Sequence, residues 1–367
     1  REESSELWNE TARFIEAGDW LVSQLVGREV RSTCQAGYKA HYLSDLGYAA
    51  EIEELVPGLG DRLAAPTPIG KAAGEVTSEW LDRTGLEGAP VVAVATVDAH
   101  AVVPAVGVSE AGTVVATLGT SACHLIMSPE CHRVPGVGGV VENGILPGLW
   151  GYEAGQAGFG DLLAWFVRTF PHGADEAESF AYYNAEAARL APGASGVMAL
   201  DWWNGCRTPL IDPELAGLFV GMTLQTTAPE LYRALLESLA FGMRRVVDTL
   251  EGGGLEIGEL VVTSGLAEKN PLLVQIIADV SGRTVRLPEV QEATARGAAI
   301  HGAVAAGAVA DFADGAARLG AQSSSSVPPD SSVGPRYSEL YQLYRRLSDS
   351  VVESGVMPAL RRLRADS

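Results

Sequence analysis

The chain has 367 residues, 47% of them hydrophobic, and a formal net charge of -20 at pH 7. This length ordinarily gives two domains with ample core, so the composition predicts a folded globular protein. The acidic balance argues against nucleic acid or an anionic membrane surface as a partner, because both need clustered Lys and Arg. An anionic ligand would therefore be held locally, by backbone donors, a metal ion or a few placed cations.

The cysteine pattern is typical of reduced thiols in a cytoplasmic protein. The four cysteines lack paired C-x-x-C spacing, and they are Cys34, Cys123, Cys131 and Cys206. The longest apolar stretch, residues 89–108, is interrupted by polar side chains and a proline, so it predicts two strands and a turn rather than a membrane span. We also expect no secretory signal peptide, since the polar start at Arg1 is followed by no apolar core.

The first part of the chain predicts short helices and one notable cation. Apolar residues recur at helical spacing over residues 7–15, and a second helix is expected to end at Gly27. Lys39 lies among small and polar residues, so it could bind a sugar hydroxyl or a phosphate. A solvated surface lysine is the other interpretation. The break at 88–90, Gly-Ala-Pro, predicts a domain boundary.

Asp98 follows a short apolar run, residues 91–97, that predicts a buried strand. Open α/β sheets place their ligand sites just beyond the carboxyl ends of strands. Asp98 is therefore a candidate base at such an end. A cap or turn carboxylate is the alternative interpretation.

A second predicted strand, Thr113–Leu118, is followed by Gly119, Thr120 and Ser121. Small residues with free N–H groups and hydroxyls can surround phosphate oxygens. The same three residues could form an ordinary turn. A candidate base and a candidate phosphate loop lie within 25 residues of each other, and the pair favours the functional interpretation more than either does alone.

Two polar segments follow in the middle of the chain. Glu153 is expected just before an amphipathic helix, where it would either stabilise the helix N-terminus or accept hydrogen bonds from a sugar. Residues 200–209 combine polar and aromatic side chains, which is typical of a structured loop lining a cleft. Within that loop Arg207 is a candidate phosphate cation, with a structural ion pair as the alternative.

The last third of the chain predicts a long helix over residues 229–250, capped by Thr227, and then a strand-turn-helix unit. In that unit a strand over residues 259–263 enters a glycine turn before a helix over residues 271–281, which lets backbone approach a flat or anionic ligand closely. Residues 322–334 are rich in Ser and Pro and predict a flexible connector to a C-terminal helix.

Seven short segments, in the same order along nearly the whole chain, resemble the FGGY family of carbohydrate kinases, most closely its members that phosphorylate L-ribulose. They are AGYKA (36–40), VDAH (97–100), TLGTS (117–121), GYEAGQ (151–156), LDWWNG (200–205), GLAEKNPLL (265–273) and RGAAI (296–300). The resemblance implies an α/β protein of the RNase H-like, actin-type ATPase fold. It also implies two domains, of which the first is incomplete.

On this resemblance, residues 1–89 form the C-terminal part of the family's N-terminal domain, and residues 90–320 form its C-terminal domain. Residues 321–367 would be a linker and a docking tail helix. The alternation of predicted strands and helices independently favours α/β.

The resemblance implies magnesium-assisted phosphorylation of the terminal hydroxyl of L-ribulose by ATP, as in L-arabinose catabolism. Asp98 would be the catalytic base and would also contact the sugar, which Lys39 and Glu153 would orient. The γ-phosphate would be held by Gly119, Thr120 and Ser121, and adenosine would be held by Gly265, Leu266 and Asn270. Other kinases of the family, acting on D-ribulose, xylulose or glycerol, remain open, as does a non-catalytic sugar sensor on the same fold.

Two departures from the family pattern affect these expectations. Ser264 stands where the family more often has a second glycine, and Arg296 replaces its usual Leu. The family's first phosphate loop, Asp-x-Gly-Thr, does not occur in the chain, so we expect that loop and the magnesium ligands to lie upstream of Arg1. The 367-residue chain alone is then expected to be inactive. The sequence leaves open whether the protein is a homodimer.

Overall fold

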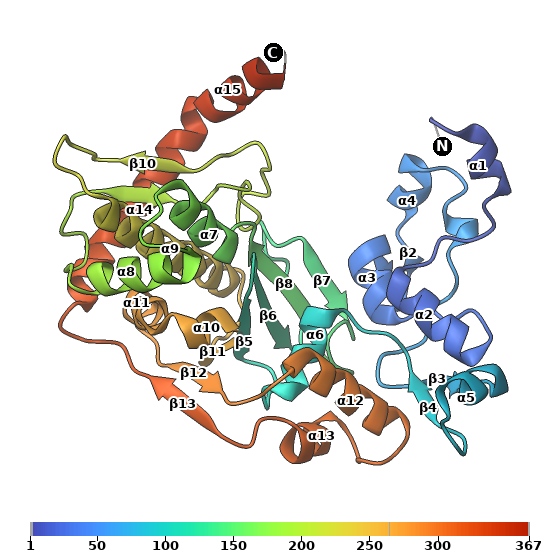
Figure 1. Ribbon diagram of the computed structural model, residues 1–367. Helices are drawn as coiled ribbons and strands as arrows, with labels where there is room; N and C mark the ends of the chain where they lie inside the picture. Colours follow the sequence, from blue (N-terminus) through green and yellow to red (C-terminus); the bar gives the residue numbers. More distant parts are fainter. Residues whose placement is uncertain (1–2, 264, 366–367) are drawn as a thin grey trace.

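A seven-stranded sheet runs through the centre of the computed structural model, which describes residues 3–263 and 265–365 (Figure 1). The strand order is β13 (Ser324–Val327), β12 (Val285–Pro288), β11 (Glu259–Thr263), β5 (Thr113–Leu118), β6 (Ala122–Ser128), β8 (Trp150–Gln156) and β7 (Gly139–Glu142). β11 is parallel to both β5 and β12, and the other neighbours are antiparallel. This mixture of antiparallel strands on one side of β5 with the parallel strands β11 and β12 on the other is the expected RNase H-like arrangement.

Both faces of the sheet are covered. Successive side chains of a strand point to opposite sides, so one strand can contribute to a buried cluster on each face. In β5, Val114, Ala116 and Leu118 belong to one buried cluster, while Val115 belongs to the other. A strand that is apolar on both faces is typical of a sheet between two helical layers. The sequence of β5 therefore specifies a central position.

One helical layer is the larger of the two (Figure 1). It consists of α7 (Gly160–Thr169), α8 (Glu176–Ala188), α9 (Ala228–Gly252), α11 (Pro271–Ser281) and α14 (Gly334–Ser354). The opposite layer consists of α6 (Asp98–Ala105), α12 (Ala293–Ala305) and α13 (Phe312–Leu319). α12 packs very closely on α6, since a Cβ on Gly297 would lie 1.7 Å from the carbonyl oxygen of Ala101.

The remaining elements lie outside these layers. A β9 (Met198–Leu200) and β10 (Leu218–Val220) hairpin flanks α9, α10 (Gly265–Lys269) follows β11, and α15 (Val356–Ala365) extends from the body (Figure 1). No described helix has both the length and the apolarity needed to cross a lipid bilayer.

Residues 3–93 form a smaller unit beside the sheet (Figure 1). Its elements are α1 (Ser5–Glu10), α2 (Ala17–Val26), α3 (Thr33–Ala40), β1 (Tyr42–Leu43), β2 (Gly47–Tyr48), α4 (Ala50–Leu55), a 3-10 turn (Gly60–Arg62), β3 (Ala72–Glu75), α5 (Ser78–Thr84) and β4 (Val91–Ala93). α3 contacts β7 at the edge of the main sheet. A Cβ on Gly37 would lie 2.2 Å from Val141 Cγ1, so glycine permits that contact.

The structure corrects the strand expected over residues 91–97. β4 ends at Ala93 and pairs with β3 in a separate two-stranded sheet. Asp98 is therefore not at the end of a sheet strand but is the first residue of α6. The apolar run continues beyond β4 because Val94 packs in a small buried cluster with Val22, Val30 and Ala73, and Val97 is the N-cap residue of α6.

The expected flexible connector over residues 322–334 is also wrong in part. Four of its residues form β13, whose Val327 pairs with Val285 of β12. Ladder hydrogen bonds come from the backbone, so a serine-rich segment can still form an edge strand. The division into 1–89, 90–320 and 321–367 remains a prediction.

Candidate active site

The carboxyl ends of the three parallel strands meet at a cavity of about 400 Å³. Its lining residues are Val102, Thr117, Thr263, Gly265, Glu268, Val290, Gln291, Glu292, Ala293 and Thr294. The hydroxyl of Thr117 is buried and has no partner among the described residues. An adjoining cavity of about 600 Å³ shares Thr263 and Glu268 with it. This is the edge at which open α/β sheets bind ligands.

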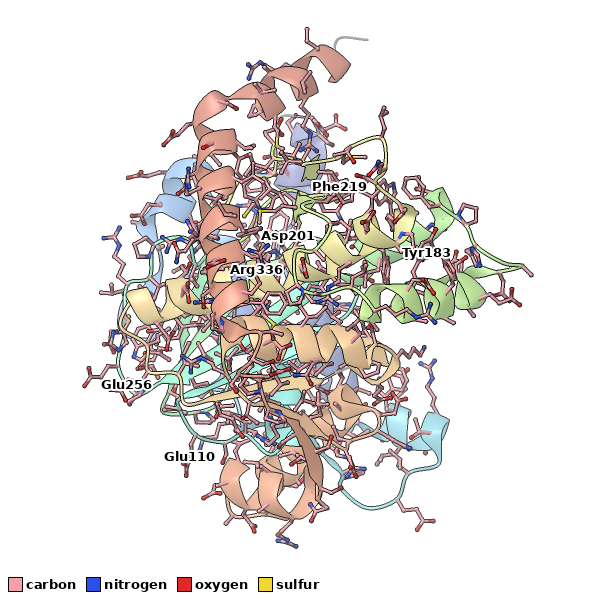
Figure 2. The ribbon with its side chains drawn as sticks, turned by 90° about the vertical axis from the view of Figure 1, so that its left-hand side faces the viewer. Glu110, Tyr183, Asp201, Phe219, Glu256 and Arg336 are labelled. Atoms are coloured by element: carbon pink, nitrogen blue, oxygen red, sulfur yellow. The ribbon has the colours of Figure 1, made fainter. Side chains whose placement is uncertain are left out.

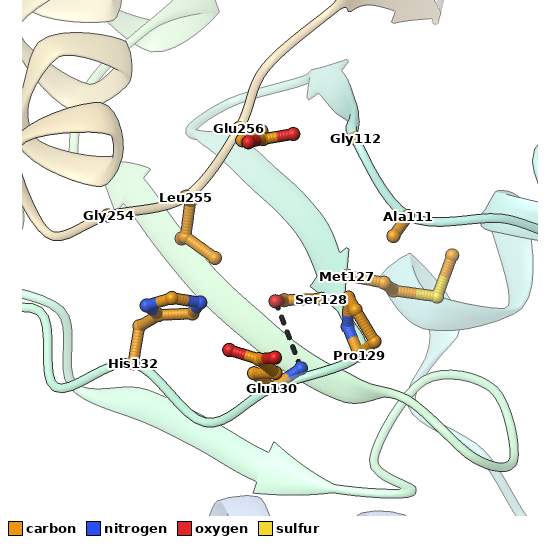
Figure 3. A pocket seen from close by; sticks show the side chains of 10 residues that line it. All are labelled: Ala111, Gly112, Met127, Ser128, Pro129, Glu130, His132, Gly254, Leu255 and Glu256. Atoms are coloured by element: carbon orange, nitrogen blue, oxygen red, sulfur yellow. Dashed lines mark hydrogen bonds between the residues drawn. The ribbon is translucent and has the colours of Figure 1, made fainter.

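A different cavity, of about 390 Å³, lies at the opposite ends of the same strands (Figure 3). It is bounded by Gly112, just before β5, by Ser128 at the end of β6, and by Glu256, just before β11. Figure 3 shows Glu130 and His132 at its rim, with the Glu130 N–H donating to Ser128 Oγ at 3.3 Å. Its position at the amino ends of the strands makes it the less suitable ligand site.

The expected phosphate loop is the turn between β5 and β6. The carbonyl oxygens of Gly119 and Thr120 accept hydrogen bonds from Gly160 N at 3.0 Å and Phe159 N at 2.9 Å. These bonds fix the turn against the start of α7. The hydroxyls of Thr120 and Ser121 have no hydrogen-bond partner among the described residues, so they are available to a ligand.

Close packing brings the expected adenosine residues next to this turn. A Cβ on Gly160 would lie 2.7 Å from the Gly119 oxygen and 3.5 Å from Leu266 Cδ2. Leu266 therefore lies beside the phosphate turn, and Gly265 lines the cavity at the strand ends. Gly119 and Leu266, which are 147 positions apart in sequence, thus contribute to one continuous surface.

Asn270 has a different environment from the other expected nucleotide residues. Its side chain is 2% exposed, its oxygen accepts from Leu273 N at 3.0 Å, and its amide nitrogen donates to Asn184 at 3.1 Å. Asn270 is thus the N-cap of α11, a role that sequence reasoning did not assign to it. We expect it to shape the nucleotide site through α11. Ser264, the departure from the family pattern, lies outside the described residues.

Asp98 is exposed in the first turn of α6. Its Oδ1 accepts from the N–H of Ala99 at 2.8 Å, and its Oδ2 has no partner among the described residues. The carboxylate is therefore held at one oxygen and available at the other. That is the arrangement a general base requires.

Glu153 lies in the middle of β8, which corrects the expectation that it precedes a helix. The alternative role as a helix-end carboxylate is excluded by this position, because α7 begins only at Gly160. Side chains of a strand are rigidly directed, so β8 holds Glu153 more firmly than a loop would.

Four charged side chains gather around Cys123 of β6. Glu153, Arg207, Asp98 and Lys39 each perturb the thiol electrostatically, and burial together with Glu153 raises the pKa of Cys123 to about 12. Lys39 and Arg207 are exposed and form no ion pair among the described residues. The alternative role of Arg207, a structural ion pair, is therefore not seen among the described residues.

His100 is a residue that sequence reasoning missed. Its imidazole is fully buried, its Nε2 lies 3.1 Å from Glu153 Oε2, and its Nδ1 lies 3.3 Å from Cys34 Sγ. The His100 hydrogen bond lowers the pKa of Glu153 against the opposing effect of burial. Burial lowers the pKa of His100, but Cys34 and Glu153 raise it more, to about 9. Its sequence signals were a polar residue interrupting an apolar run and its place in the segment VDAH, to which no role was assigned for the histidine.

The described residues do not form a metal site of their own. Within residues 3–263 and 265–365, no group of three or more His, Cys, Asp or Glu side chains is arranged to hold a metal ion. The site offers four charged side chains around Cys123, a turn with two hydroxyls that have no partner among the described residues, and a cavity of about 400 Å³ at the strand ends. This combination on this fold defines a carbohydrate kinase of the RNase H-like, actin-type ATPase class.

The chain belongs to the FGGY family of carbohydrate kinases, whose C-terminal domain matches residues 114–306. A ribulokinase from Halalkalibacterium halodurans is 41% identical over 387 residues, which cover 99% of this chain and 68% of that protein. A ribulokinase from Geobacillus thermodenitrificans is 39% identical, over 95% of this chain and 65% of that protein. The chain thus spans about two thirds of the length of these curated relatives.

Solved structures agree on the fold. Xylulose kinase from Rhodospirillum rubrum superposes with a TM-score of 0.82 at 25% identity, over 93% of this chain and 68% of that one. A kinase from Brucella ovis, described as a xyloylose kinase, gives a TM-score of 0.84 at 21% identity, over 95% of this chain and 70% of that one. The expected fold class and kinase family are confirmed.

Proposed function

We propose that the protein containing this chain transfers the γ-phosphoryl group of ATP to the terminal hydroxyl of L-ribulose, giving L-ribulose 5-phosphate. The observation that carries the proposal is the gathering of Asp98, Lys39, Glu153 and Arg207 beside the turn that joins β5 and β6. The similarity to ribulokinases supports the choice of sugar.

In this reaction the sugar oxygen attacks the γ-phosphorus, the bond from phosphorus to the bridging oxygen breaks, and ADP leaves. Asp98 accepts the hydroxyl proton through Oδ2, the oxygen that has no partner in the part of the chain that the structure describes. Such transfers depend on positioning and on charge stabilisation rather than on covalent catalysis. Lys39 and Glu153 would position the sugar hydroxyls.

On the nucleotide side, the hydroxyls of Thr120 and Ser121 and the backbone near Gly119 would hold the γ-phosphate. Gly265 and Leu266 would face adenosine, and Arg207 is close enough to Glu153 to stabilise charge at the boundary between the two substrates. Magnesium would enter bound to the phosphates of ATP, as is usual for this ion. Among the residues that the structure describes, no three His, Cys, Asp or Glu side chains are placed to hold the ion.

The cellular setting is part of the same proposal. All four cysteines are unpaired, which fits a protein that works in the reducing cytoplasm. Its partners would be a small sugar and ATP, with neither nucleic acid nor a membrane surface among them, as the net charge of -20 favours.

The complete protein should be tested against a panel of L-ribulose, D-ribulose, D-xylulose and glycerol by ATP-dependent ADP release. We expect kcat/KM for L-ribulose to exceed the others by at least about tenfold, a difference of about 1.4 kcal/mol in transition-state binding. Preference for another sugar would reassign the substrate within the family. Sugar binding without ADP release would instead support a sensor.

A further inference from the structure

A chain of buried contacts ends at the proposed sugar carboxylate. Cys34 and His100 are both 0% exposed, whereas the side chain of Glu153 is 25% exposed. The contacts run from Cys34 Sγ to His100 Nδ1 at 3.3 Å and from His100 Nε2 to Glu153 Oε2 at 3.1 Å. Only the last member of this array therefore reaches solvent.

The sulfur of Cys34 accepts hydrogen bonds from a backbone N–H and from a hydroxyl. Val97 N lies 3.5 Å and Thr96 Oγ1 lies 3.8 Å from Sγ. With those lone pairs engaged, the thiol proton is directed to His100 Nδ1, which leaves the ring proton on Nε2. A fully protonated imidazole also carries a proton on Nε2. In both states His100 donates to Glu153.

The array connects the three elements that carry the proposed sugar residues. Cys34 lies on α3 with Lys39, His100 lies on α6 two residues after Asp98, and Glu153 lies on β8. Tyr38 covers the imidazole, with ring centroids 4.4 Å apart. The ring is thus held on several sides and cannot easily turn away from Glu153.

We propose that His100, oriented by Cys34, is a positioning residue for the sugar-binding carboxylate of Glu153. This inference rests on the proposed function for the role of Glu153. A nucleophilic role for Cys34 is excluded by its complete burial. The array fixes which oxygen of Glu153 is engaged by the protein and leaves the other for a sugar hydroxyl.

Two substitutions in the complete protein separate the contribution of Nε2 of His100 from that of Nδ1. His100→Gln places an amide nitrogen near the former Nε2 and can still donate to Glu153. His100→Asn places its amide near the former Nδ1 and loses the hydrogen bond to Glu153. We expect His100→Asn to raise the sugar KM about 10- to 100-fold, the effect of one hydrogen bond to a charged group. His100→Gln should stay within about threefold of wild type, and the KM for ATP should not change in either variant.

His301→Asn is the matched control, because His301 is also buried but its ring nitrogens have no partner among the described residues. It should leave the sugar KM unchanged. Equal KM values for His100→Gln and His100→Asn would overturn the proposal, as would loss of kcat with an unchanged KM. Those results would indicate a merely structural imidazole.

Nitrogen-15 NMR of the His100 ring tests the array even if no sugar is phosphorylated, so the two proposals fail separately. We expect a protonated Nε2 whose shift changes in Glu153→Gln and stays constant in Lys39→Met. An unprotonated Nε2, or a shift indifferent to Glu153→Gln, would refute the array whatever the substrate is.

Discussion

Asp98 has one carboxylate oxygen engaged by its own helix and one oxygen that has no partner within residues 3–263 and 265–365. This asymmetry fits a base that must keep its orientation while accepting a proton. Glu153, only 55 residues later, has its engaged oxygen bound by a buried imidazole instead. Two carboxylates at one site are thus differentiated by what holds them, which supports proton transfer for one and substrate positioning for the other.

Asp98→Asn in the complete protein should lower kcat for the sugar by about 10² to 10⁴, the usual contribution of a placed general base. That range corresponds to about 3 to 5 kcal/mol of activation free energy. The Asn oxygen can still accept from Ala99 N, so the start of α6 should be preserved. Steady-state kinetics with sugar and ATP varied separately provide the measurement.

In Asp98→Asn, the dissociation constants of sugar and ATP, measured by calorimetry, should remain close to those of wild type. A sugar affinity that falls in proportion to kcat would assign Asp98 to binding rather than to proton transfer.

At the scale of elements, α14 is attached to the body through tyrosine hydroxyls as well as apolar packing. Figure 2 shows this helix running along the molecule, with Asp201 beside it. Tyr337 accepts from Arg233, while Tyr341 and Tyr344 donate to Asp248 and Asp201 at 2.6 and 2.7 Å. The carboxyl of Asp201 is buried and also accepts from Gln156 at 2.8 Å.

Tyr344→Phe should lower the free energy of unfolding by about 1 to 3 kcal/mol, because it leaves a buried carboxyl without one of its donors. Urea unfolding followed by fluorescence gives the measurement. Tyr182→Phe is the control, since the hydroxyl of Tyr182 has no hydrogen-bond partner among the described residues, and it should change stability little. Equal effects of the two substitutions would mean that the Tyr344 hydroxyl contributes nothing specific.

Elements with strong local signals were predicted well from the sequence. β5, β11 and α11 have the predicted bounds, and α9 has its Thr227 cap with Glu230 completing a capping box. These segments combine clear periodicity with caps or flanking glycines.

Segments whose structure depends on distant partners were predicted poorly. β8 contains two glycines and a glutamate in seven residues, and it is a strand because β6 and β7 pair with it on both sides. β13 is a strand because β12 offers it a free edge. The contact between His100 and Glu153 joins residues 53 positions apart, and no local pattern specifies such a pairing.

At the scale of the whole molecule, the candidate site needs residues from the smaller N-terminal unit and from the main sheet. Lys39 and Cys34 come from α3, and Asp98 and Glu153 come from elements of the main body. The relation between them depends on how closely α3 approaches β7. Gly37 sets that distance, because its backbone faces Val141 where a side chain would collide.

Gly37→Ala should therefore be destabilising, although alanine favours a helix over glycine by about 1 kcal/mol. The new Cβ would lie 2.2 Å from Val141 Cγ1 and must displace α3 or Val141. Overpacking of this kind costs about 1 to 3 kcal/mol, so it outweighs the propensity gain. We also expect a higher sugar KM in the complete protein, since Lys39 and the Cys34 contact move with α3.

Gly302→Ala provides the matched control, because Gly302 lies within α12 and an added Cβ would have no neighbour within 4 Å. It should raise the free energy of unfolding by about 0.5 to 1 kcal/mol.

Combining Gly37→Ala with Val141→Ala removes the colliding methyl groups, so the sugar KM of the double variant should return much of the way to the wild-type value. The corresponding double-mutant cycle should show about 0.5 to 3 kcal/mol of favourable coupling. Strictly additive effects would mean that removing the Val141 methyl groups does not reverse the rise in sugar KM caused by Gly37→Ala. The contact between α3 and β7 would then not set the geometry of the sugar site.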